Sequence, residues 1–273
     1  MPCATFDGRR LSAGAWITVL ALIGCAAAST ANLAAASPTF EEITEEYYPV
    51  QPDATISVRN RDGAIRIYGA ETEEVKVQAI KRAYSADRLK RITVSVSSKP
   101  GSLAIETSIP AKSKGWFAFD RSGTVEYNIV VPQTCRVSNL ELADGEVVIE
   151  GMRGPGVKAS LGNGSLVGHN CFGDLQFSVV NGGLDLFYDW WENRRMALNL
   201  RAENSGVRAI LPSDAAFSLD AETRNGHIVN AFLAKEPKPS GAVNALMEVI
   251  GVDPQAQITI RTGNGNIRID EAY

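Results

Sequence analysis

One short pattern recurs along this chain: a β-prone run, an Asn-Gly or Asp-Gly corner, and a second β-prone run. It reads RNRDGAIRI at 59–67, SLGNGSLVG at 160–168, SVVNGGLDL at 178–186, AETRNGHIV at 221–229 and RTGNGNIRI at 261–269. Asn and Gly both tolerate positive φ, so each corner lets the chain turn sharply at little steric cost. The sequence therefore predicts short β units joined at glycine corners.

The corners are spaced almost evenly. Taken in order, the turn glycines lie 19, 18, 24, 20 and 39 residues apart, where 39 is about twice the common spacing: Gly145, Gly164, Gly182, Gly206, Gly226 and Gly265. Gly63 precedes Gly145 by 82 residues, or about four units. Self-similarity at a fixed period is the signature of a repeat array.

Apolar and polar residues alternate on both sides of each corner. In the last unit Ile258 and Ile260 precede the corner, Ile267 and Ile269 follow it, and a polar residue separates the members of each pair. Alternation of period two, with β-branched residues, predicts half-buried strands. The expected fold class is all-β.

Two all-β arrangements fit this pattern. In a parallel β-solenoid, or β-helix-like stack, each unit of about 19–20 residues is one coil, and the coils lie about 4.8 Å apart. In an antiparallel β-sandwich or barrel, each Asn-Gly is instead a two-residue hairpin turn. The near-equal periods favour the solenoid, because a sandwich has no need for units of equal length.

The repeated corner pattern resembles the bacterial putative-adhesin family, envelope domains of unknown function built from Gly-turn repeats. The resemblance covers residues 55–270 and is strongest in 137–186 and 218–270. Three stretches depart from it: 83–125, 187–196 and 233–254. The resemblance implies an exported β-solenoid-like protein, in some cases tied to envelope stress responses, with no catalytic residues.

The N-terminal segment is predicted to be an export leader. Arg9 and Arg10 precede AGAWITVLALIGCAAA, an apolar run without charge. Cleavage after Ala36 would give a soluble exported protein, LIGC (22–25) resembles a lipobox that would leave Cys25 acylated, and an uncleaved anchor is the third alternative. The expected domains are a signal peptide or leader (1–36), a linker (37–54) and a β-repeat domain (55–273).

Composition argues against a nucleic-acid partner. The net charge is −4, and the basic residues cluster only in the short runs IKRAY (80–84) and DRLKR (87–91). We expect contact with a membrane only through a lipid anchor at Cys25.

The sequence carries no recognisable catalytic, metal or cofactor motif. Ser165 lacks the flanking glycines of a nucleophile elbow. The two histidines, His169 and His227, follow their corner glycines by five residues and one residue, so they are not expected to form a metal pair. We expect a protein that is not an enzyme and that has no cofactor.

Two departures from the repeat concentrate aromatic residues beside charged ones. They are LFYDWWENRRM (186–196) and KGWFAFDRSG (114–123). Flat rings beside charges suit glycan or protein recognition, and the same segments could instead cover an exposed strand edge. The candidate binding surface consists of Tyr188, Trp190, Trp191, Trp116 and Phe117.

Two further expectations concern local structure. Val243, Leu246, Met247 and Ile250 have helical spacing, which predicts a short amphipathic helix within 238–254.

Cys135 and Cys171 lie 36 residues apart at nearly the same phase of the repeat. In a solenoid, one coil near Arg153 would separate them by about 9.6 Å, too far for a disulfide, so two partly buried free thiols are expected.

The functional hypotheses are therefore broad. The first is an adhesin-like binding or scaffolding module of the periplasm, outer membrane or cell surface, whose partner is an envelope protein or a glycan. The second is an envelope-stress component that contacts another envelope protein. A glycan-active enzyme on a β-helix is the third, and the scattered acidic residues do not favour it.

Overall fold

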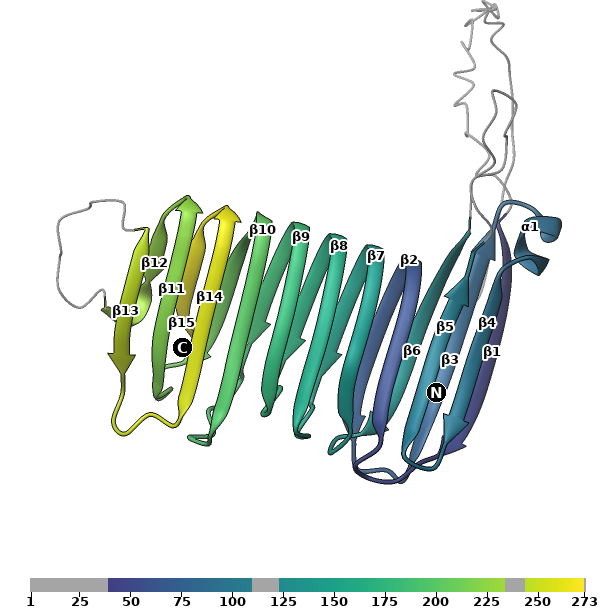
Figure 1. Cartoon of the computed structure of the whole chain (residues 1–273), viewed down its shortest axis with the longest axis horizontal. Coiled ribbons are helices and arrows are strands. Elements are labelled where there is room, and N and C mark those ends of the chain that lie inside the picture. Colours follow the sequence, from purple (N-terminus) through teal and green to yellow (C-terminus); the bar gives the residue numbers. More distant parts are fainter. Residues whose placement is uncertain (1–38, 110–122, 234–243, 273) are drawn as a thin grey trace, which may run out of the picture. The chain divides into compact units, whose positions relative to one another are not determined.

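The computed structural model describes residues 39–109, 123–233 and 244–272. They form an all-β fold with one unclosed, mixed sheet of 15 strands (Figure 1). The strands are β1 (Phe40–Pro49), β2 (Thr55–Ala70), β3 (Glu74–Ala83), β4 (Thr93–Lys99), β5 (Ser102–Ser108), β6 (Thr124–Pro132), β7 (Arg136–Glu150), β8 (Gly156–His169), β9 (Asp174–Phe187), β10 (Met196–Pro212), β11 (Phe217–Asn225), β12 (Ile228–Asn230), β13 (Ala245–Ile250), β14 (Ala256–Asn264) and β15 (Ile267–Ala272). The helical elements are α1 (Ala86–Lys90) and the 3₁₀ turn η1 (Ala231–Leu233).

The repeat units of the sequence are long bent strands that pair in parallel. Strands β2, β7, β8, β9 and β10 follow one another in the sheet, and their corners lie in register. Gly145 lies opposite Gly63, Gly164 opposite Gly145, and Gly182 opposite Gly164. The segments before and after each of these corners pair with the same neighbouring strand, so these corners are bends and not two-residue hairpins.

The order of the strands departs from the order of the sequence at the C-terminal end. Strand β14 lies between β10 and β11, and β15 lies between β10 and β12. The last segment of the chain, β14 and β15, thus lies between β10 and the unit formed by β11 and β12, although it follows both in sequence. This insertion explains the spacing of 39 residues between Gly226 and Gly265, because the segment that joins the two corners includes β13.

Antiparallel strands flank the parallel run at both ends. Strand β13 pairs antiparallel with β11, and β4 with β5. Next to the part of β2 that follows its corner, β3 pairs antiparallel with β6, and β1 with β3.

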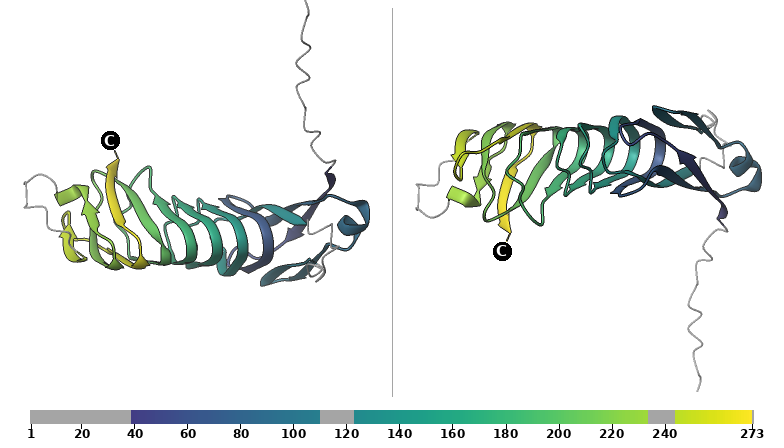
Figure 2. Two further views of the ribbon diagram at one scale, coloured as in Figure 1. Left: turned by 90° about the horizontal axis from the view of Figure 1, so that it is seen from above. Right: turned by 90° about the horizontal axis from the view of Figure 1, so that it is seen from below.

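Both arms of each bent strand line the same core. In β8, Val157, Ala159 and Leu161 are buried before the corner, Leu166 is buried after it, and all four belong to one hydrophobic cluster. The sheet folds over at the corners and encloses this cluster between its arms (Figure 2). The alternation read from the sequence therefore corresponds to inward and outward directions.

The corners require glycine because successive backbones approach closely there. Gly182 has φ +131°, and a Cβ atom on it would lie 1.8 Å from the carbonyl oxygen of Gly164. The same distance separates a Cβ on Gly164 from the carbonyl oxygen of Gly145. No side chain fits in that space, so both the backbone conformation and the packing between strands select glycine.

The residues just before the corners form a ladder of side-chain hydrogen bonds. Each amide donates to the equivalent residue on the neighbouring strand: Asn225 to Asn264 (2.7 Å), Asn264 to Asn204 (2.7 Å), Asn204 to Asn181 (3.1 Å), Asn181 to Asn163 (2.8 Å) and Asn163 to Asp144 (2.8 Å). All the amides point the same way, and the row ends on a carboxylate that only accepts. Aligned hydrogen bonds of this kind strengthen one another.

Two of the predicted turn glycines play other roles. At the corner of β10, Ser205, not Gly206, lies opposite Gly182, and its hydroxyl donates to the carbonyl oxygen of Gly182. Gly226 has no positive φ. A Cβ there would nevertheless lie 2.1 Å from the carbonyl oxygen of Gly265, so close approach alone selects glycine at this position.

Two local predictions were wrong. The expected linker, 37–54, contains strand β1, which pairs with β3 along its whole length. The helix expected within 238–254 is instead strand β13 over Ala245–Ile250, where pairing with β11 outweighs the helical spacing of Leu246, Met247 and Ile250. Val243 lies outside the described residues.

The thiols of Cys135 and Cys171 are free and buried, as their spacing predicts. The intervening unit is also where it was expected: Arg153 N–H donates to the carbonyl oxygen of Gln133 (2.7 Å), and Phe172 N–H to that of Met152 (2.8 Å). Burial raises the pKa of Cys135 to about 11 and that of Cys171 to about 12. Both groups are therefore protonated, inert thiols at neutral pH.

Within the described ranges, no helix is long and apolar enough to cross a membrane. The predicted leader and the candidate lipidation site Cys25 lie outside those ranges.

We predict that Gly182→Ala destabilises the protein by about 3 kcal/mol or more, because it adds backbone strain to a clash with the adjacent strand. Gly183 is the matched control: its φ is not positive, and the nearest atom to an added Cβ lies 4.0 Å away. Gly183→Ala should change the free energy of unfolding by about 1 kcal/mol or less. Urea denaturation of both variants measures the difference, and equal midpoints would contradict the packing argument.

Candidate functional site

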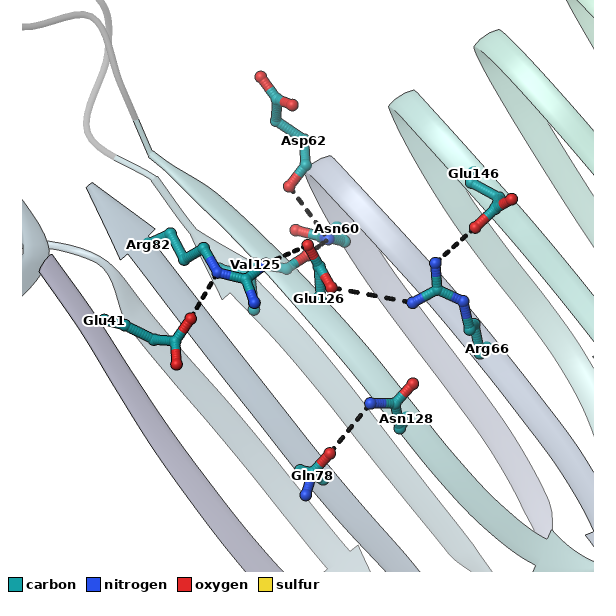
Figure 3. Close-up of polar contacts among 10 residues, drawn as sticks. All are labelled: Glu41, Asn60, Asp62, Arg66, Gln78, Arg82, Val125, Glu126, Asn128 and Glu146. Atoms are coloured by element: carbon teal, nitrogen blue, oxygen red, sulfur yellow. Dashed lines mark hydrogen bonds and ion pairs between the residues drawn. The ribbon is translucent and has the colours of Figure 1, made fainter. Parts of the chain in front are cut away.

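Three surfaces of the described chain combine polar or aromatic side chains in numbers that could serve a function. The first is a row of charged side chains across β1, β3, β6, β2 and β7 (Figure 3). Arg82 pairs with Glu41 (2.6 Å) and with Glu126, and Arg66 pairs with Glu126 (3.8 Å) and Glu146 (2.6 Å). The charges alternate in sign along the row.

This row helps to hold β1, the outermost strand on this side of the sheet, in place. The Asn128 amide on β6 donates to the Gln78 carbonyl oxygen on β3 (3.0 Å), and Lys76 pairs with Glu45 on β1 (3.1 Å). Nearly every side chain of β1 is exposed, so it has little apolar packing to hold it. Exposed ion pairs contribute about 0.2–1 kcal/mol each, and charges on an edge strand discourage pairing with other chains. We assign this row a structural role.

A buried amide fixes the first corner beside the charged row. The Asn60 side chain donates to the carbonyl oxygen of Val125 (2.7 Å) and to that of Asp62 (3.4 Å) (Figure 3). It also accepts from the N–H of Arg61 (2.8 Å). These bonds satisfy the amide, which is only 4% exposed.

The second surface is the aromatic corner, which we define as Phe172, Tyr188, Trp190, Trp191 and Phe217. Tyr188 is buried, and its hydroxyl donates to the carbonyl oxygen of Cys171 (2.5 Å). Its ring contacts Phe172 on one side (centroids 5.2 Å apart) and Trp191 on the other (5.5 Å). Trp191 also contacts Phe217. The predicted binding residues Tyr188 and Trp191 therefore pack mainly against the core.

Trp190 is the most exposed member of the aromatic corner. Its side chain is 46% exposed, and its ring lies 5.3 Å from that of Phe172. Its indole N–H donates to Glu192 (3.1 Å), which also pairs with Arg153. The hydrogen bond from Arg153 is the largest cause that holds the pKa of Glu192 below its usual value. Ring and carboxylate are thus held in a fixed position beside each other.

Polar residues order the chain next to Trp190. The Asn170 amide donates to the Asp189 carboxylate (2.8 Å) and accepts from the Asp189 N–H (2.9 Å). This bond from Asn170 is the main cause that lowers the pKa of Asp189. His169 also contacts Asp189 (2.8 Å), so it is a paired side chain at the edge of the aromatic corner.

His227, the second histidine, is exposed. Within the described ranges, no group of three His, Cys, Asp or Glu side chains is arranged to hold a metal.

The third surface is the polar wall, formed by two outward-facing rows on the first arms of β8, β9 and β10 and on β14. It lines a shallow groove. One row is Lys158, Gln176, Asn199 and Thr259, and the other is Ser160, Ser178, Arg201 and Arg261; within each row the residues are direct partners across the strands.

The polar wall was missed in the sequence, although its signal is present there. Its residues precede the aligned corner residues Gly164, Gly182, Ser205 and Gly265 by six positions in one row and by four in the other. Using Gly206 as the corner shifts the β10 unit by one residue and breaks both rows. The other predicted binding residues, Trp116 and Phe117, lie outside the described residues.

Comparison with known proteins gives a likeness of fold. No family model and no curated protein matches the sequence. A solved structure of a putative cell adhesion protein from Clostridium sporogenes has a TM-score of 0.52 and 17% identity, covering 85% of this chain and 100% of that one. A putative adhesin from Bacteroides fragilis has a TM-score of 0.31 and 10% identity over 84% and 97% of the two chains. A putative lipid binding protein from Parabacteroides distasonis has 0.22 and 8% over 83% and 96%.

The aromatic corner leads to a prediction that separates packing from recognition. Trp191→Ala should lower the free energy of unfolding by about 3 kcal/mol, because it empties a site between Tyr188 and Phe217. Trp190→Ala should lower it by about 1 kcal/mol, because that ring has one aromatic neighbour and is half exposed. Thermal or urea denaturation measures both.

Trp191→Phe provides the control for ring packing. The Trp191 indole nitrogen is buried without a hydrogen-bond partner among the described residues. Phenylalanine keeps most of the ring contact and removes that group, so less than half of the alanine effect should remain. If Trp190→Ala destabilises the protein more than Trp191→Ala, the assignment of the two rings is wrong.

Proposed function

We propose that this chain is an exported β-solenoid of the putative-adhesin type, which acts as a non-enzymatic binding module of the cell envelope. The observation that carries the proposal is the parallel, in-register pairing of β2, β7, β8, β9, β10 and β14. Stacking of this kind repeats the same outward positions at intervals of about 4.8 Å. It gives a rigid surface on which rows of side chains can contact an extended partner.

The contrast between inward and outward positions supports this function. The inward positions are filled by one hydrophobic core, and glycines and asparagines fix the corners. Outward positions are free of these packing requirements and carry polar side chains that can hydrogen-bond to a ligand. Side chains that a rigid scaffold holds in place lose little entropy on binding.

The fold likeness to the Clostridium sporogenes protein, whose name describes cell adhesion, agrees with this proposal. An adhesin-like module works outside the cytoplasm, and the predicted leader (1–36) is the signal for its export.

Binding without turnover is tested with the protein purified from an exporting host. On an array of bacterial-envelope and host-surface glycans, the protein should retain a restricted set, and mass spectrometry should recover those glycans unchanged after prolonged incubation. Shortened or modified glycans would contradict the non-enzymatic proposal. Retention of no glycan and of no envelope protein, relative to heat-unfolded protein, would contradict the binding module.

Export is tested separately by the mass of the mature N-terminus. An acylated Cys25 establishes a lipoprotein, and Cys25→Ser should then release the protein from the membrane fraction, because the acyl chains provide the anchor. A chain that begins at Ser37 establishes soluble export. An intact Met1 in the cytoplasmic fraction would contradict export altogether.

A further inference from the structure

The polar wall contains eight outward-facing side chains and no carboxylate. Three of them are cationic, Lys158, Arg201 and Arg261, and five are neutral hydrogen-bonding groups: Ser160, Gln176, Ser178, Asn199 and Thr259. The whole chain carries 31 acidic and 27 basic residues, with a net charge of −4. A carboxylate-free, cationic surface is thus a local reversal of the overall charge.

Three of the acidic residues that flank the polar wall already have partners; a fourth, Glu203, is exposed two residues beyond Arg201 on β10, and no ion pair is recorded for it among the described residues. Glu141, next to Ser160, pairs with Arg59 (2.8 Å). Asp220, next to Thr259, pairs with Arg261 (2.5 Å). Glu222 lies beside Arg261 at 3.5 Å, so Arg261 is largely neutralised by its neighbours.

Lys158 and Arg201 are the cations that remain available for a ligand. Both are exposed, and the structure records no ion pair for either of them across residues 39–109, 123–233 and 244–272. Asp174, on the strand next to Lys158, accepts instead from the backbone N–H of Ala197 (2.9 Å). The two cations lie on β8 and β10, with β9 between them.

We propose that the polar wall binds a linear acidic polysaccharide that runs across the strands. The Arg201 guanidinium matches a carboxylate with two parallel hydrogen bonds, and Lys158 provides a second charge two strands away. The amide of Gln176 lies on β9 between them, that of Asn199 lies beside Arg201 on β10, and both pair with sugar hydroxyl groups. This inference rests on the proposed function and names its ligand class.

The same surface is less suited to other anionic partners. Its eight side chains include no aromatic residue on which nucleic-acid bases could stack. The apolar residues that border the groove, Phe177 and Leu200, are buried and face the core, so they cannot insert into a lipid bilayer. The repeated hydroxyl and amide groups beside isolated cations match a polymer that alternates hydroxyls with carboxylates.

The test uses polygalacturonate immobilised on a biosensor, with dextran as the neutral polymer. The wild-type protein should bind polygalacturonate and not dextran, and the affinity should fall when the salt concentration is raised about tenfold, because the contacts are ionic. Arg201→Gln and Lys158→Gln should each weaken binding about tenfold, which corresponds to the loss of one charge-assisted hydrogen bond. Arg201→Lys should fall between the wild type and Arg201→Gln.

Arg208→Gln is the matched control. Arg208 lies on the same strand beyond the corner, pairs with Asp270 (3.4 Å) and changes the net charge by the same amount. It should change the affinity less than about twofold. The denaturation midpoint of every variant shows whether a loss of binding reflects unfolding, since exposed outward positions should leave it unchanged.

Several outcomes would overturn the inference. If Arg201→Gln and Lys158→Gln bind polygalacturonate like the wild type, the polymer binds elsewhere. If the wild type binds duplex DNA or anionic vesicles and not polygalacturonate, the ligand class is wrong. If the protein ignores polygalacturonate and still retains other glycans or an envelope protein, this inference fails and the proposed function stands; if it retains nothing, both fail.

Discussion

The fold depends on how closely successive backbones meet at the corners. A Cβ at Gly145, Gly164 or Gly182 would lie 1.8 Å from the carbonyl oxygen of the preceding corner glycine, so only glycine fits where these corners are aligned. The corners therefore fix the register of the parallel strands. Register decides which side chains enter the core, because a shift of one residue would exchange the inward and outward faces.

The asparagine ladder adds direction to this register. Five side-chain hydrogen bonds run from Asn225 to Asp144, and each amide both donates and accepts along the row, except at the ends. The ladder crosses between β10 and β14 without a break, although the chain reaches β14 only after β11 and β13. The inserted C-terminal segment thus satisfies the same hydrogen bonds as a unit that follows in sequence, which explains how it fits between β10 and β11.

The sequence predicted the features that follow from local chemistry. Corner glycines, alternating strands and the two free thiols all depend on residues within one or two units, and the resemblance to exported adhesin-like repeats led to the same fold class. The position of β14, the strand at β1 and the strand at β13 depend on pairing between distant segments, which no local pattern encodes. Leu246, Met247 and Ile250 have helical spacing, yet an available strand edge on β11 determines their structure.

The candidate sites were predicted less well, for a physical reason. Aromatic residues attract attention in a sequence, but Tyr188 and Trp191 serve mainly to fill the space where β9 leaves the core and β10 enters it. The polar wall consists of unremarkable residues, such as Lys158 and Arg201, which become a surface only when the units are aligned on their true corners. Where strands stack in register, the inward residues are constrained by packing, so information about a partner can reside only in the outward rows. In this acidic chain, the absence of carboxylates from the β8, β9, β10 and β14 positions of two such rows is the local composition that packing does not explain.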